Sequence, residues 1–217
     1  MGHLAVSLAR STAEPGIDGG LADEKGREMT TKLGSREVDV VLRDGSTVHV
    51  CPAKPSDAPA VRRLLEGLSD RSRWLRFFSA APDLAQAVRW ATDVDDGHRH
   101  GLVATAAGDG RVVGHAGFER EPDRPERAEV ALEVADAVQG KGLGTVLLCQ
   151  LAEAANRVGV QVFDAEVLPE NHRMIRVFRD CGYPVKVHSL PGVRLVELQT
   201  SRAAKALPRG ESHEQAA

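Results

Sequence analysis

The feature that most constrains this chain is a glycine-rich loop, Gln139 to Thr145, between an apolar strand and an amphipathic helix. Its letters are Gln-Gly-Lys-Gly-Leu-Gly-Thr. Backbone N–H groups and the positive end of the helix dipole meet at such a junction and attract phosphate. Glycine permits both the unusual dihedrals and the close approach of phosphate oxygens. Three alternating glycines exceed what a turn requires, so the sequence predicts an anion site.

Hydrophobic periodicity divides the rest of the chain into the elements of an α/β sandwich. A charged loop is expected at residues 121–127, because it contains two prolines. The predicted order implies a mixed, mostly antiparallel central sheet flanked by helices. We expect strands at 38–42, 48–50, 102–107, 111–119, 128–135, 160–167, 183–189 and 193–198, and helices near 57–67, 74–78, 82–94, 143–158 and 171–180.

Length and composition predict one folded domain at residues 37–200. Residues 1–36 lack any sustained period and are predicted to be a disordered tail, within which Met29 is an alternative start. Residues 201–217 are predicted to be a flexible tail. The net charge of -3 disfavours a nucleic-acid partner. No apolar run approaches the roughly 20 residues of a membrane helix, so we expect a cytoplasmic protein with no membrane partner.

Cysteine and histidine spacing indicates neither a disulfide nor a metal site. Cys51, Cys149 and Cys181 lie far apart and show no CxxC pattern, so we expect them to be small core residues. His98 and His100 have no third ligand nearby in the sequence and are expected at the surface.

Two common phosphate ligands do not fit the glycine loop. A Walker A loop ends in Gly-Lys-Ser/Thr, whereas Lys141 is followed by Gly142. A dinucleotide fingerprint requires its third glycine where Thr145 stands. ATP, GTP and NAD are therefore disfavoured.

The pattern Gln139-x-x-Gly142-x-Gly144 resembles the coenzyme A signature of the GNAT acetyltransferase superfamily. The resemblance extends over about residues 37–199. Within the superfamily the chain resembles the bacterial Pat-type protein lysine acetyltransferase domain. The segments that suggest this subgroup are Arg43-Asp44-Gly45-Ser46, Pro55-Ser56-Asp57-Ala58, Arg76-Phe77-Phe78 and Ala128-Glu129-Val130-Ala131, and a second family motif is matched by Asn171, Phe178 and Cys181-Gly182-Tyr183.

The resemblance implies that acetyl-CoA binds along this loop and that an amine attacks the thioester directly. The amine then needs a base, because a lysine ammonium has a pKa of about 10.4. Glu129 matches the Pat-type base position, and Glu133, on the same strand face, is the reserve candidate. The predicted coenzyme contacts are Leu132, Val134, Gln139, Gly140, Lys141, Gly142, Leu143, Gly144, Thr145 and Asn171.

Several assignments stay open at this point. Backbone N–H groups between Leu132 and Val134 are candidates to stabilise the oxyanion. Asn171 is equally well explained as a helix N-cap. The family often has a tyrosine acid where this chain has Phe178, so no group is identified that protonates the leaving thiolate.

Side chains near the acceptor side receive structural interpretations. Arg73 and Arg76 are expected on a solvated face. Trp74, Phe77 and Phe78 are expected to be core, although Phe77 or Phe78 could line the acceptor side of the cleft.

The resemblance implies acetylation of lysine side chains on folded proteins such as acyl-CoA synthetases. The acidic residues Glu121, Asp123 and Glu126 near the base would attract a lysine-bearing surface. Acetylation of a small amine, such as a polyamine or an aminoglycoside, is the alternative, and a non-catalytic acyl-CoA sensor is the rival from another class. We expect no cyclic-nucleotide domain within the 36 N-terminal residues.

Overall fold

The computed structural model describes residues 37–94 and 98–201. The predicted tails, 1–36 and 201–217, lie outside these residues except for Ser201. The described chain is an α/β sandwich built on one mixed sheet of eight strands, as the sequence predicts. The strands are β1 (Val38–Val41), β2 (Thr47–Pro52), β3 (Arg99–Ala106), β4 (Val112–Glu121), β5 (Arg124–Val134), β6 (Val162–Val167), β7 (Val185–Leu190) and β8 (Val193–Gln199).

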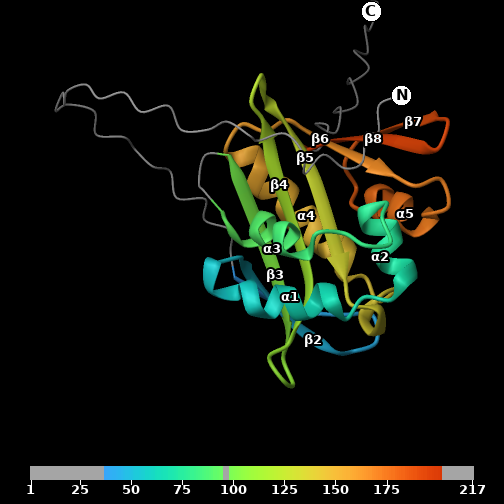
Figure 1. The fold of residues 1–217 in the computed structure, drawn as a ribbon. Coiled ribbons are helices and arrows are strands. Elements are labelled where there is room, and N and C mark those ends of the chain that lie inside the picture. The colour runs from blue at the N-terminus through green and yellow to red at the C-terminus, as the bar shows by residue number, and fades with distance from the viewer. Residues whose placement is uncertain (1–36, 95–97, 202–217) are drawn as a thin grey trace, which may run out of the picture.

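The strand order is β1-β2-β3-β4-β5-β6-β8-β7, and every neighbouring pair is antiparallel except β5 and β6. The α-helices of the described residues cover both faces of this sheet, with α1, α2 and α3 in front of it and α4 behind it in Figure 1. The α-helices are α1 (Ala58–Glu66), α2 (Asp70–Phe77), α3 (Leu84–Thr92), α4 (Leu143–Arg157) and α5 (His172–Asp180).

Strand alternation sends side chains from the central strands to two separate cores. On one face, Val130 of β5 joins the cluster that holds the buried side of α4 and residues of α5. On the other face, Ala131 of β5 packs with α1 and α3 residues such as Val61 and Trp90. The sheet is therefore covered on both sides, and consecutive residues of β5 serve different cores.

The only parallel pair of the described sheet is short. Residues Arg127, Ala128 and Glu129 of β5 pair with Val162, Phe163 and Asp164 of β6. Beyond Glu129 the two strands separate, while β5 keeps pairing with β4 as far as Val134. After Glu129, the edge of β5 that faces β6 therefore pairs with no strand. This gap between the two strands is the opening of the candidate site.

Residues 121–127 differ from the expected loop. β4 continues to Glu121 and β5 begins at Arg124, so the two strands form a long hairpin. The register shifts between Arg120 and Glu121, which lets the ladder accommodate the turn. Prolines indicated irregular backbone, but they are tolerated next to a bulge and at strand starts.

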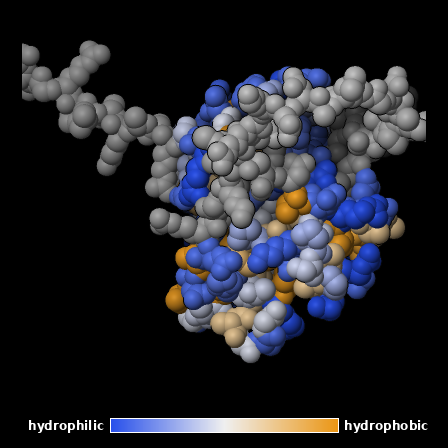
Figure 2. Space-filling model, turned by 90° about the vertical axis from the view of Figure 1, so that its left-hand side faces the viewer, coloured by the Kyte–Doolittle hydropathy of each residue, from blue (hydrophilic) through white to orange (hydrophobic). Residues whose placement is uncertain are grey.

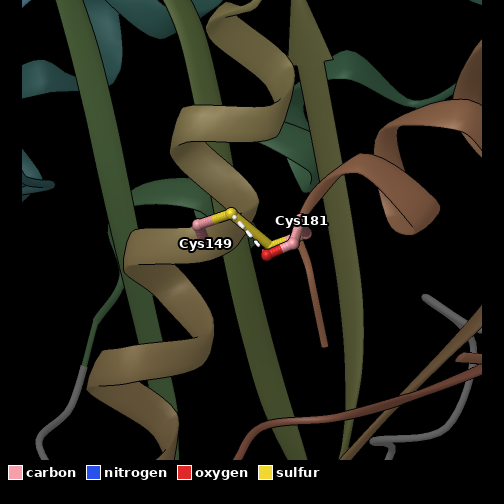
Figure 3. Close-up of a disulfide and its surroundings, with 2 residues drawn as sticks. All are labelled: Cys149 and Cys181. Atoms are coloured by element: carbon pink, nitrogen blue, oxygen red, sulfur yellow. Dashed lines mark hydrogen bonds between the residues drawn. A yellow bond between two sulfur atoms is a disulfide. The ribbon is translucent and has the colours of Figure 1, made fainter. Parts of the chain in front are cut away.

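The prediction that the cysteines form no disulfide was wrong. The structure joins Cys149 of α4 to Cys181, the residue after α5, in a disulfide with the Cα atoms 5.5 Å apart (Figure 3). The partners are 32 residues apart in the sequence, and only the packing of α5 beside α4 brings them together. Cys51 is the free cysteine.

The surface seen from the left-hand side of Figure 1 is mainly hydrophilic where it is coloured, with separate hydrophobic spots (Figure 2). None of the helices in the two described ranges is long and apolar enough to cross a membrane.

Candidate active site

The glycine loop forms an open cradle of backbone between β5 and α4. Gly140 and Gly142 adopt left-handed dihedrals, with φ of +79° and +98°. Gly142 is the N-cap of α4, so the N–H groups of Leu143, Gly144 and Thr145 lie in the first helical turn and have no intrahelical acceptor. No atom lies within 4 Å of the Cβ that Gly140 would carry. These N–H groups, together with the open space at Gly140, fit a phosphate group.

The turn between β1 and β2 contacts the glycine loop and holds it in place. The Arg43 N–H donates to the Lys141 carbonyl at 3.1 Å. Lys141 Nζ pairs with Asp44 Oδ2 at 2.8 Å. Hydrogen bonds from Lys141 and Ser46 hold the pKa of the Asp44 carboxyl below its usual range. The Arg43-to-Ser46 segment, noted in the sequence for family resemblance only, thus contacts the loop directly.

Asp136 ties the same region to helix α2. Its carboxylate accepts from the N–H and the hydroxyl of Ser69, both at 2.9 Å, and from the Ser72 hydroxyl at 2.5 Å. The Gln139 amide nitrogen donates to the Val134 carbonyl and to Ser72 Oγ, both at 3.1 Å. Sequence reasoning missed this clamp because Ser69 and Asp136 are 67 residues apart.

A cavity of about 520 Å³ leads from the cradle to the point where β5 and β6 separate. Its walls are β5, β6, the N-terminal part of α5 and one side of α2. At one end it is bounded by Gln139, Gly140, Leu143 and Gly144, and at the other by Glu129, Ala165 and Glu166. The predicted coenzyme residues Leu132, Val134 and Asn171 also line it.

Glu129 faces this cavity from β5. Burial is the largest influence and raises the pKa of the Glu129 carboxyl to about 7; Arg76 opposes the rise, and Glu119, Glu166 and Glu121 add to it. A carboxyl with such a pKa exchanges a proton readily at neutral pH. Glu129 therefore stays the candidate for the general base that the sequence predicts.

Glu133 lies on the same face of β5, four residues after Glu129, but in a different environment. Its Oε2 accepts from Arg76 Nε and its Oε1 contacts His115 Nδ1, both at 2.8 Å. Burial alone would raise the pKa of Glu133, but the charges and hydrogen bonds of Arg76 and His115 lower it to about 2. Both carboxylate oxygens are thus occupied by protein partners, and the group remains ionised.

The expectation of a solvated Arg76 was wrong. Its side chain is 11% exposed and lies over the Phe77 ring, 4.8 Å from the centroid. An arginine at helical spacing on a polar helix looks solvent-facing in sequence. Only the packing of α2 over β5 reveals its buried partner, Glu133.

Glu166 faces the cavity from β6, on the opposite wall from Glu129. Burial raises the pKa of its carboxyl. Its Oε2 is buried and has no hydrogen-bond partner among the residues that the structure describes. The sequence did not lead us to this residue. A glutamate inside an alternating apolar strand is nevertheless a sequence signal for a functional carboxylate, because burying a charge is costly.

Other side chains can also be placed against their predictions. Asn171 is the N-cap of α5 and accepts from the Met174 N–H at 3.1 Å. Phe77 is a core residue, as expected, whereas Trp74 was expected in the core but is exposed. Neither Phe77 nor Phe78 lines the cavity. His100 was expected at the surface but is buried beside Phe118, with ring centroids 5.8 Å apart. Within residues 37–94 and 98–201 no group of His, Cys, Asp and Glu side chains is arranged to hold a metal ion.

Known proteins share both the sequence pattern and the fold. The family described as Acetyltransferase (GNAT) family matches residues 68–183. The acetyltransferase Pat of Mycolicibacterium smegmatis is 33% identical over 148 residues, which are 67% of this chain and 44% of that protein. This chain thus spans less than half the length of that curated relative.

Two solved structures are similar to the described fold. The GNAT domain of S. lividans PAT is 39% identical, with a TM-score of 0.66 over 75% of this chain and 96% of that one. A cAMP-binding acyltransferase from Mycobacterium smegmatis is 26% identical, with a TM-score of 0.54 over 76% of this chain and 48% of that one.

Proposed function

Since this chain belongs to the GNAT family of acetyltransferases, we propose that it acetylates lysine side chains of folded proteins. Membership makes the chain an acyltransferase with acetyl-CoA as its co-substrate; the protein acceptor and the residue roles are our proposal. One observation carries the roles: Glu129 faces the cavity where β5 and β6 separate, and its pKa is raised to about 7. That value suits a base that must act at neutral pH.

We assign each part of acetyl-CoA to a part of the cavity or of the glycine loop. The pyrophosphate is assigned to the N–H groups of Gly142 through Thr145, where helix dipole and backbone donors converge. The pantetheine amides are assigned to the unpaired edge of β5 around Leu132, in the manner of an added strand. The Gln139 side chain already bonds to the Val134 carbonyl, so Gln139 closes this edge at the loop end. The acetyl group then reaches the region of Glu129.

Each proton and bond of the transfer can be followed. Glu129 takes one proton from the bound ammonium, which leaves a neutral amine. The amine nitrogen forms a bond to the thioester carbonyl carbon, and backbone N–H groups between Leu132 and Val134 stabilise the oxyanion. The C–S bond then breaks, and the thiolate receives the second nitrogen proton through solvent. Phe178 has no proton to give, which is tolerable because a thiol of pKa about 8.5 is a fair leaving group.

We assign Glu133 a structural role as the buried partner of Arg76 and His115, and no longer consider it the reserve candidate for the base. Both its oxygens bond to Arg76 and His115, and a pKa of about 2 makes it a poor proton acceptor at neutral pH. The same Arg76 charge acts on Glu129, and it keeps the pKa of Glu129 from rising further.

The lysine acceptor is supported by similarity to Pat proteins and by the charge of the site. The chain is 39% identical to the GNAT domain of S. lividans PAT, and the similarity covers 96% of that domain. Glu129 and Glu166 are among the acidic side chains that line the cavity, and their carboxylates attract an ammonium group. An acyl-CoA synthetase is the protein class that the Pat-type resemblance implies.

The test is a competition between acceptor classes. The protein is incubated with labelled acetyl-CoA and either a panel of acyl-CoA synthetases, spermidine or an aminoglycoside, and acetylated lysines are mapped by mass spectrometry. We expect stoichiometric acetylation at one or a few lysines of a synthetase. Turnover on spermidine or the aminoglycoside with only trace labelling of the proteins would refute the lysine assignment and support a small-amine acetyltransferase.

A further inference from the structure

The strand register places Glu166 across the cavity from Glu129. Glu129 pairs with Asp164, the last β5–β6 pair, so Asp164 and Glu129 share one face of the sheet. Glu166 lies two residues further along β6 and therefore projects from the same face. It stands where β6 has diverged from β5, so the opening runs between the two glutamates.

The Glu166 carboxylate has no structural task that explains its burial. Asp164, its neighbour on the same face, is bound by Arg127, whose Nε donates to it at 2.7 Å. Glu166, by contrast, keeps a buried oxygen without a partner among the described residues. A buried carboxylate oxygen left unpaired costs stability, so its retention indicates a partner that arrives with a substrate.

We propose that Glu166 is a specificity-determining residue that holds the incoming ammonium group of the acceptor jointly with Glu129. This inference rests on the proposed function. Glu129 removes a proton from the ammonium, and Glu166 accepts a hydrogen bond from it without taking a proton. The pair selects primary amines that are cationic, because a neutral acceptor offers no charge to either carboxylate.

The surrounding charges support this division of labour. The groups that act on Glu129 are Arg76 from α2, Glu119 and Glu121 from β4, and Glu166 from β6. Glu119 is already bound by Arg99 and by the Trp90 ring N–H, and Glu121 by Arg124. Glu166 is the member of this set with an unoccupied buried oxygen, and its negative charge raises the pKa of Glu129.

The test measures ammonium binding without requiring turnover. n-Butylamine, which carries the end of a lysine side chain, is titrated into the protein at pH 8 in the presence of coenzyme A. Binding is followed by NMR of ¹³Cδ-labelled glutamate, which also reports the pKa of Glu129. n-Butanol, of nearly the same shape but uncharged, is the ligand control. Glu166→Gln is the test variant, Glu166→Asp keeps the charge, and Glu153→Gln on the outer side of α4 is the matched control.

We expect Glu166→Gln to weaken n-butylammonium binding about tenfold or more, as for loss of a charged hydrogen bond. We also expect the pKa of Glu129 to fall, because a neighbouring negative charge is removed. Glu166→Asp should retain part of the binding, and Glu153→Gln should match the parent protein. A purely structural role for Glu166 would leave the binding of n-butylammonium unchanged, although the pKa of Glu129 would still fall with the loss of the neighbouring charge.

Two outcomes separate this inference from the proposed function. If Glu166→Gln binds n-butylammonium like the parent while Glu129→Gln abolishes transfer, the inference is overturned and the proposed function stands. If Glu166→Gln weakens binding but Glu129→Gln transfers normally, the joint role of the pair is overturned together with the assignment of the base.

Discussion

The cradle can be tested by a pair of glycine substitutions at the two ends of one helix. Gly142 begins α4 with φ of +98°, and Gly159 follows its end with φ of +84°. An alanine at either position meets no close atom: its Cβ is 3.6 Å from the Arg43 side chain at Gly142 and touches nothing within 4 Å at Gly159. Both replacements should therefore cost the same left-handed strain, about 1–2 kcal/mol.

That strain corresponds to a fall in Tm of about 2–8 °C for a domain of this size. Only Gly142→Ala should affect coenzyme binding, because relief of the strain rotates the N–H groups away from the phosphate. The parent protein should gain about 2.7 kcal/mol of stability at acetyl-CoA concentrations of about 100 times Kd. A tenfold weaker complex would lose about 1.4 kcal/mol of that gain.

Thermal denaturation with and without acetyl-CoA, together with calorimetry, gives both quantities. We expect equal destabilisation of the two free variants and a Kd at least about tenfold higher for Gly142→Ala only. If Gly142→Ala and Gly159→Ala bind acetyl-CoA equally well, the loop is not the pyrophosphate site and the reasoning fails.

Three further predictions concern the ion pair and the cysteines. The folded-state pKa of Glu133, about 2, is below its ordinary value, so Glu133 stabilises the fold above about pH 5 and loses this contribution as the pH falls towards 2. The free energy of unfolding in urea should therefore depend less on pH in this range for Glu133→Gln than for the parent protein. An equal pH dependence for the two proteins would contradict the assignment. Arg76→Met leaves Glu133 buried without its cation and should cost about 3–5 kcal/mol in urea unfolding, whereas a loss below about 1 kcal/mol would indicate that the pair is solvated. With Cys149 and Cys181 joined, the unfolded, unreduced chain should show one thiol, Cys51, with Ellman's reagent; three thiols before reduction would show that the bond is absent.

Local sequence patterns predicted the elements because each pattern acts over a few residues. Alternation and helical spacing located the strands and helices, and the glycines located the cradle. The same alternation placed Glu129 and Glu133 on one face of β5, as the continuous β4–β5 register shows. These predictions needed no knowledge of which segments meet in space.

Pairing between distant segments decided the rest. Glu129 and Glu133 differ because Arg76 and His115 reach Glu133, and these come from 57 and 18 residues away. The Asp136 clamp on α2 depends in the same way on the docking of a helix over the sheet. The position of Glu166 at the cavity depends on the separation of β6 from β5, whereas the sequence shows only a charged residue in a strand.

If Glu129 is the base, its ionisation controls the pH dependence of kcat/KM. For the parent protein with a synthetase acceptor, kcat/KM should fall on the acid side with an apparent pKa of about 7, because only the ionised carboxylate accepts a proton. Glu129→Gln should lower kcat by about a hundredfold or more, remove this acid limb and leave the Kd for acetyl-CoA unchanged. A Glu129→Gln variant that keeps its kcat and the acid limb, or a loss of activity confined to Glu133→Gln, would contradict the account.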